Sequence, residues 1–116
     1  MTVKDLEFRG SSREELIEFP SSAKKDAGYE LDRVQRGLEP FDWKPMKTIG
    51  AGVREIRIKQ DGGAFRVIYV AKFEEAIYVL HAFEKKSQKT PQKSIAIAQN
   101  RYRELVTERA AVSKKR

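Results

Sequence analysis

The residues best suited to chemistry are cations placed at intervals along the middle of the chain. They are Arg54, Arg57, Lys59, Arg66, Lys72, Lys85, Lys86 and Lys89. Many of them alternate with Val, Ile, Tyr and Phe, a composition typical of a pleated, half-buried strand. Fixed cations stabilise the negative charge that develops on a phosphate while its bonds change. The pattern therefore indicates a small sheet that holds a polyanion.

RNA is a polyanion that such a surface can cleave without a metal, because its own 2′-hydroxyl can attack the neighbouring phosphate. The protein then has to orient the strand, stabilise the added negative charge, and move two protons. Arg66, Lys85, Lys86 and His81 are the candidate set, and a lysine whose pKa is lowered by nearby cations can transfer a proton. His81 has an alternative role, since a lone histidine within a strand is more often a hydrogen-bonded core residue.

Composition excludes several other classes of site. The chain has no cysteine and one histidine, so it offers no disulfide, no thiolate nucleophile and no zinc–thiolate site, and we expect no metal or cofactor. No run of about 18 apolar residues is present, so no membrane span is expected. The N-terminus is polar and lacks the features of a signal peptide, which predicts a cytoplasmic protein.

The distribution of charge also favours an acidic partner. The net charge is +7, yet residues 1–84 hold 14 Lys and Arg against 15 Asp and Glu. Residues 85–116 hold 10 against 2, so the whole basic excess lies in the last quarter of the chain. Contacts from Lys and Arg to phosphates release counterions and dominate affinity for nucleic acids. The alternative is a solvated basic helix followed by a disordered tail.

The elements that must position these residues follow from periodicity. Residues 53–59, 65–73 and 76–83 predict three strands of an antiparallel meander, and Asp61-Gly62-Gly63 predicts a tight turn between the first two. Alternation places Glu55, Arg57 and Lys59 on one face, with Arg54 on the other. Arg66 lies in an otherwise apolar strand, so it either pairs with an acid such as Glu55 or Glu84 or opens into a cleft.

The flanking segments predict helices. Residues 4–8 read as a first strand, at a sheet edge or paired with the meander. Residues 12–18 read as a short helix, for which Ser11 with Glu14 and Ser12 with Glu15 both have capping-box spacing. Residues 21–36 read as a second helix that Gly37 ends. Its apolar stripe is formed by Ala27, Leu31, Val34 and Leu38. Residues 39–52, which include Trp43 and Lys47, read as an irregular loop pinned on the core.

Thr90 and Pro91 predict the start of a last helix over residues 91–108, with Lys93 outside and a frayed tail from residue 109. The predicted order is thus β-α-α-β-β-β-α. This is an α+β fold, with one domain over residues 1–108 and a disordered basic tail over 109–116. Arg54, Lys59, Lys89, Lys93 and Lys47 are expected to bind nucleic acid around the catalytic set.

Several segments together resemble the RelE/ParE superfamily of bacterial toxins, and most closely its HigB-like, phage-related branch. They include FRGSSREEL, GYELDRVQRG, GGAFRVIYVAKF and LHAFEKKSQKTP, and the resemblance extends over residues 6–108. It implies a toxin that cleaves mRNA on the ribosome without a metal, and that a helix-turn-helix antitoxin neutralises. A ParE-like toxin that inhibits DNA gyrase is the alternative on the same fold, and a non-catalytic nucleic-acid-binding protein is a further one.

The resemblance also implies roles for individual residues. Arg66 falls on the family's phosphate-stabilising arginine, and Lys86 or Lys85 falls on the basic residue after the last strand, with Lys86 preferred. The basic pair of the first meander strand falls on Glu55 and Arg57. The sequence departs from the family there, because Glu55 replaces a cation and leaves the general base unassigned.

Overall fold

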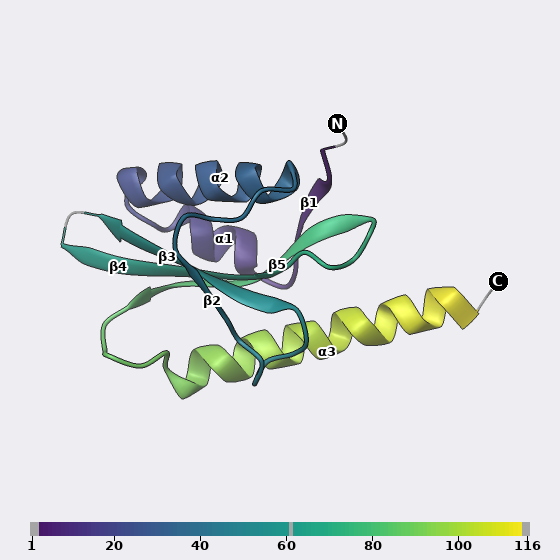
Figure 1. The fold of residues 1–116 in the computed structure, drawn as a ribbon. Coiled ribbons are helices and arrows are strands. Elements are labelled where there is room, and N and C mark those ends of the chain that lie inside the picture. The colour runs from purple at the N-terminus through teal and green to yellow at the C-terminus, as the bar shows by residue number, and fades with distance from the viewer. Residues whose placement is uncertain (1–2, 61, 115–116) are drawn as a thin grey trace.

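The computed structural model describes residues 3–60 and 62–114. In chain order, the elements are β1 (Asp5–Phe8), α1 (Ser12–Ile17), α2 (Ser21–Gln35), β2 (Trp43–Pro45), β3 (Val53–Gln60), β4 (Gly63–Val70), β5 (Ala76–Lys85) and α3 (Gln92–Lys114). One five-stranded sheet forms the middle layer. The helices α1 and α2 cover one face of the sheet, and α3 runs across the other (Figure 1). The fold is α+β, as predicted.

The strand order across the sheet is β1-β5-β4-β3-β2. The meander β3–β4–β5 is antiparallel, as predicted. β1 pairs in parallel with β5, so the sheet is mixed and not wholly antiparallel. Parallel pairing requires a long connection between strands, and here two helices and three strands lie between β1 and β5. The predicted edge position of the first strand is confirmed.

β2 is an additional strand inside the segment that was predicted to be irregular. It pairs with β3 through Trp43 opposite Ile56 and Pro45 opposite Arg54. A three-residue strand that ends in proline has little periodicity, and proline is tolerated there because β2 is an edge strand. Trp43 is half-buried, and the guanidinium of Arg54 lies 4.0 Å from its ring centroid.

The alternation of side chains along the meander divides the core into two parts. Facing α1 and α2 are Ile56, Ile58, Phe65, Val67 and Tyr69. Facing α3 are Val53, Ile68, Val70, Tyr78 and Leu80. The alternation predicted for β3 and β4 is therefore confirmed, and each face of the sheet is closed by helices.

The helices differ from expectation in the position of Leu38 and in the length of α3. α2 ends as predicted, with Gly37 in a left-handed conformation at φ +82°, but Leu38 lies beyond the helix and is 51% exposed. α3 continues to Lys114, six residues past its predicted end at Glu108. Residues 109–114 are thus helical where a disordered tail was predicted, while residues 115–116 lie outside the described part of the chain.

Candidate functional site

The centre of the candidate site is Glu55 of β3, whose side chain is completely buried. Thr90 donates a hydrogen bond from Oγ1 to Glu55 Oε2 at 2.9 Å. Lys44 Nζ lies 3.7 Å and Arg66 Nε lies 3.6 Å from Oε1. These two ion pairs are longer than hydrogen bonds, so Oε1 and Nε have no hydrogen-bond partner among the described residues. The buried carboxylate is thus held largely by charge.

Arg66 of β4 is buried, with 6% of its surface exposed, and donates from Nη1 to the carbonyl of Phe65 at 3.0 Å. Arg57 lies directly opposite it on β3. Burial lowers the pKa of Arg66, the charge of Glu55 raises it, and Arg57 lowers it again. Two like charges opposite each other are destabilising in a sheet, and Glu55 offsets them. Of the predicted alternatives for Arg66, pairing with Glu55 is confirmed.

Lys85 is the last residue of β5 and lies opposite Ala64. It shares a face with Arg66, because Arg66 lies opposite Phe83, two residues before Lys85. Burial lowers the pKa of Lys85, and the charge of Arg66 lowers it further, while Glu55 opposes the shift. The position of Lys85 therefore reduces its proton affinity.

Lys86, the residue preferred from the sequence, is exposed and follows the end of the strand. The geometry favours Lys85 instead. β5 continues two residues further than predicted, so the pleat extends to Lys85 and directs it to the face of Arg66. We call Lys44, Arg57, Arg66 and Lys85, with Glu55 at their centre, the Glu55 cluster.

Arg57 extends this cluster to the edge of the sheet. Its backbone N–H donates to the carbonyl of Asp42 at 2.8 Å, and its Nη1 lies 3.9 Å from Asp42 Oδ1. The side chain of Arg57 remains 36% exposed, as does that of Lys44. The cluster thus combines a buried centre with cations that reach solvent.

The other predicted nucleic-acid contacts are not equally close to this centre. Arg54 lies on the opposite face of β3, against Trp43 and 3.9 Å from Glu39, so it is separated from the cluster by the sheet. Lys59 continues β3 past Arg57 and is exposed. Lys47, Lys89 and Lys93 are exposed on the β2–β3 connection, the β5–α3 connection and α3.

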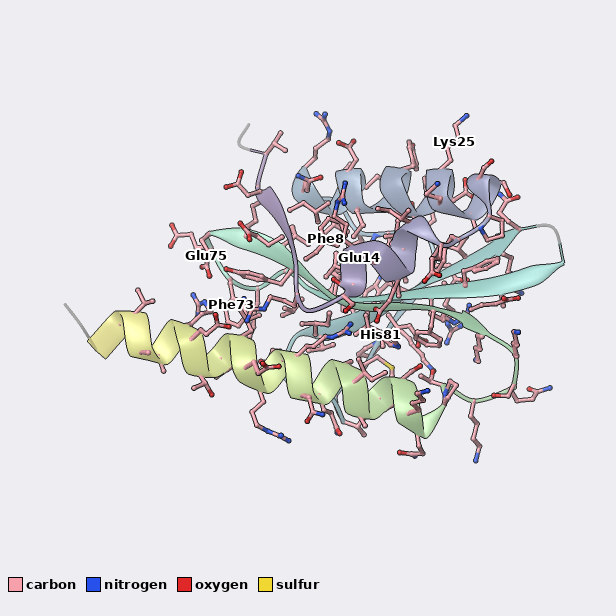
Figure 2. The ribbon with its side chains drawn as sticks, turned by 180° about the vertical axis from the view of Figure 1, so that it is seen from behind. Phe8, Glu14, Lys25, Phe73, Glu75 and His81 are labelled. Carbon is pink, nitrogen blue, oxygen red and sulfur yellow. The ribbon has the colours of Figure 1, made fainter. Side chains whose placement is uncertain are left out.

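His81 belongs to a second group of polar residues between α1, β5 and α3. Figure 2 shows His81 between α1 and α3. Its Nδ1 lies 2.8 Å from Glu15 Oε1, and its Nε2 lies 3.1 Å from Ser94 Oγ. Arg101 donates to both oxygens of Glu15 at 2.9 and 3.0 Å, and the N–H of Ala82 donates at 3.2 Å. We call Glu15, His81, Ser94 and Arg101 the Glu15 cluster.

The surroundings of His81 in the Glu15 cluster favour its neutral form. Burial lowers the pKa of His81, and the hydrogen bond and charge of Glu15 only partly oppose this. In the neutral ring Nδ1–H donates to Glu15, and Nε2 accepts the hydroxyl hydrogen of Ser94. His81 therefore links α1 and α3 to β5. This is the hydrogen-bonded core role that was the alternative to catalysis.

The sequence did not indicate that Glu55 lies at the centre of a group of cations, or that Lys44 and Thr90 contact it. Thr90 was expected to cap α3, but α3 begins at Gln92 and the Thr90 hydroxyl serves Glu55. The departure of Glu55 from the basic pattern of its strand was the available signal.

Neither a metal nor a membrane span finds support in the described residues. No group of three or more His, Cys, Asp or Glu that could hold a metal ion occurs within residues 3–60 and 62–114. In that same part of the chain, no helix is both long and apolar enough to cross a bilayer.

The sequence matches the model of a known protein family. Residues 14–103 match the sequence model of the family described as Phage derived protein Gp49-like (DUF891). The chain belongs to this Gp49-like family. The family is part of the RelE/HigB-type superfamily of toxin–antitoxin toxins, which implies an antitoxin as partner. No match was found among curated proteins.

The part of the chain that matches the Gp49-like family includes both clusters, from Glu15 of α1 to Arg101 of α3. The fold is compatible with the RelE-like fold that the resemblance implied. The family is associated with RNase-like toxin activity, which agrees with a cation cluster suited to phosphate.

Proposed function

We propose that this chain is the toxin of a type II toxin–antitoxin pair, of the HigB-like branch, and that it cleaves mRNA on the ribosome. The observation that carries the proposal is the Glu55 cluster, in which four cations share one face of the sheet around a single buried carboxylate. The surplus of positive charge is suited to one phosphate of a single strand.

The proposed reaction uses the 2′-hydroxyl of the message as nucleophile. The hydroxyl gives up its proton to a water molecule as its oxygen forms a bond to the adjacent phosphorus. The bond from phosphorus to the 5′-oxygen breaks at the same time, giving a 2′,3′-cyclic phosphate and a 5′-hydroxyl. Arg57 and Arg66 stabilise the negative charge that increases on the phosphate, and Glu55 keeps Arg66 oriented. Lys85 donates a proton to the leaving 5′-oxygen, a role that its lowered pKa supports.

A toxin that inhibits DNA gyrase without cleaving RNA is the second candidate. The observation in its favour is the low exposure of Arg66, whose Nε already faces Glu55 at 3.6 Å. An arginine held in this way also fits a purely structural ion pair. In that case the basic residues of α3 serve contact with a protein partner.

Primer extension on cellular transcripts after brief induction separates the two candidates. The wild type should give cuts in translated messages with the phase of the codons, and Lys85→Ala should suppress them far more than the matched neighbour Lys86→Ala. His81→Gln should keep substantial cleavage if the variant folds. Intact messages accompanied by double-strand breaks in DNA would instead identify the gyrase-directed toxin.

A further inference from the structure

Two aromatic rings beside the edge of β3 are exposed although large aromatic side chains are usually buried. Tyr29 of α2 is 57% exposed, and Phe41, just before β2, is 71% exposed. Their rings are nearly parallel, 11° apart, with centroids separated by 6.2 Å. The guanidinium of Arg33 lies 4.0 Å from the centroid of Phe41. Exposed flat rings of this kind are surfaces on which nucleobases stack.

A cavity of about 320 Å³ adjoins these rings. Its lining includes Tyr29 and Phe41 on one side and Arg57 and Lys59 of β3 on the other. β2 pairs with β3 as far as Ile56, and the carbonyl of Asp42 accepts the N–H of Arg57, so this edge of β3 is uncovered only beyond Arg57. The cavity lies on the α2 side of the sheet and the Glu55 cluster lies on the other face. Arg57 belongs to both, so the two sites meet at this edge of β3.

The cavity also contains an acceptor that lacks a partner. Glu30 lines it, and the side chain of Glu30 is only 8% exposed. Its Oε2 accepts the N–H of Phe41 at 2.8 Å, while Oε1 has no hydrogen-bond partner among the described residues and lies 3.9 Å from Arg33 Nε. A buried acceptor without a donor is costly, and a ligand that brings an N–H removes that cost.

We propose that this cavity binds one base of single-stranded RNA next to the scissile phosphate. The base stacks on Tyr29 and Phe41, its donor edge faces Glu30, and Arg57 and Lys59 contact the flanking phosphates. Guanine fits best, because it presents two adjacent N–H donors that a carboxylate can accept, whereas uracil presents one. The proposal rests on the proposed function, which supplies the RNA strand at the Glu55 cluster.

The test is fluorescence polarisation with labelled six-nucleotide RNAs that carry 2′-O-methyl groups, because these lack the nucleophile and cannot be cut. One probe is all uridine and the other has a single guanosine. The wild type should bind the guanosine probe more tightly. Tyr29→Ala and Phe41→Ala should each weaken that binding roughly tenfold, as expected for the loss of one stacking partner.

Two controls keep the result specific. Leu38→Ala removes another exposed apolar side chain on the same connection, outside this cavity, and should leave RNA binding unchanged. Tyr29→Phe keeps the ring and should retain binding. Circular dichroism melting of every variant establishes that it is folded. Equal affinity of the wild type and both alanine variants for the probes would overturn the proposal, and so would failure of the wild type to bind either probe.

Primer extension with the same variants distinguishes this proposal from the proposed function. Cleavage by the wild type together with unchanged RNA binding by Tyr29→Ala and Phe41→Ala would reject the base site and leave the nuclease intact. Ring-dependent RNA binding without cleavage by the wild type would support the base site and reject the nuclease. Loss of antitoxin binding alone, with RNA binding unchanged, would identify the rings as a protein-docking surface and overturn the proposal.

Discussion

The Glu55 and Glu15 clusters each gather cationic or imidazole groups around one carboxylate, but the carboxylates are held differently. Glu15 accepts hydrogen bonds at 2.8–3.2 Å from His81, Ala82 and Arg101. Within residues 3–60 and 62–114, Glu55 accepts one hydrogen bond, from Thr90, and its nearest cations remain 3.6–3.7 Å away. Burial is greater for Glu55, whose side chain is 0% exposed against 22% for Glu15.

The difference separates a structural group from a group that is ready to bind. In the Glu15 cluster one arginine balances one carboxylate and the histidine is neutral, so hydrogen bonds and charges are used within the fold. In the Glu55 cluster four cations exceed the charge of one carboxylate, and donors are left for an incoming anion.

Glu55→Ala should reduce the free energy of unfolding by about 3–5 kcal/mol, because it leaves Arg66 buried without its counter-charge. Urea unfolding measures the change. Glu84→Ala, which removes an exposed carboxylate from β5, is the matched control and should change stability little. A stable Glu55→Ala protein would mean that solvent or Thr90 compensates Arg66 and that the contrast between the clusters is wrong.

Arg66→Lys should separate stability from activity within the same cluster. A lysine retains the positive charge next to the Glu55 carboxylate, so the urea midpoint should move only slightly. Cleavage should fall about 100-fold, roughly 3 kcal/mol, because the fixed fork of donors is lost at the phosphate. Single-turnover cleavage of a ribosome-bound message gives the rate. Full activity in Arg66→Lys would assign phosphate stabilisation to other cations.

Glu15→Gln should lower stability by about 1.5–3 kcal/mol, the usual range for hydrogen bonds to a charged group, because Arg101 and His81 lose their carboxylate. The cleavage rate of the folded fraction should stay unchanged, since this cluster lies outside the proposed chemistry. Thermal unfolding and single-turnover kinetics on the same preparation provide both values. A large loss of rate at unchanged stability would place His81 among the catalytic groups.

Acid should destabilise the protein through the Glu15 cluster. Burial lowers the pKa of folded His81 below that of the unfolded chain, so stability falls as pH drops below the unfolded value of about 6.5. For Glu15, burial raises the pKa, but the hydrogen bonds from Arg101 and His81 outweigh it and the net pKa is lowered. Its contribution is present above the unfolded pKa and is lost as pH falls through the folded one.

Melting temperatures measured from pH 7.5 to pH 4 test this expectation. The wild type should lose stability across the range, and His81→Gln should lose less of it between pH 7.5 and 5.5, where Glu15 stays ionised. Identical profiles for the two proteins would show that other groups govern the acid transition.

The smallest effect is expected at the C-terminus. A chain that ends at Arg109 keeps the ion pair of Arg109 with Glu75 and the contact of Leu105 with the core. Val112, the largest apolar side chain lost from the helix, is 66% exposed, so the urea midpoint should stay within error. The salt dependence of RNA binding should become shallower, because basic residues are removed. A marked loss of stability would show that the end of α3 packs on the fold.

Periodicity predicted most of the fold, because the spacing of apolar residues along a strand or helix indicates which face of that element is buried. It predicted that Arg66 pairs with an acid such as Glu55 or Glu84 or opens into a cleft, because a lone cation in an apolar strand needs a counter-charge or solvent. It could not predict that Glu15 leaves its expected capping box with Ser12. Ser12 donates instead to the carbonyl of Val79, and Glu15 turns to β5 and α3.

The choice between Lys85 and Lys86 was also beyond the sequence. Adjacent residues point to opposite faces of a strand, so an uncertainty of one residue in the register inverts the assignment. β5 contains a further irregularity, since Ile68 pairs with His81 and Tyr69 with Val79, which leaves Leu80 as an extra residue. Such a bulge depends on contacts with the neighbouring strand.

The parallel pairing of β1 with β5 has a consequence for the synthesis of the chain. Ser12, at the start of α1, bonds to Val79, 67 residues later in sequence, and Glu15 reaches Arg101, 86 residues later. Contacts over such separations form late, because much of the chain must close into loops first. A nascent chain therefore cannot complete its first strand and helix before β5 and part of α3 have left the ribosome. Products that end before α3 should stay unfolded and harmless to the cell that makes them.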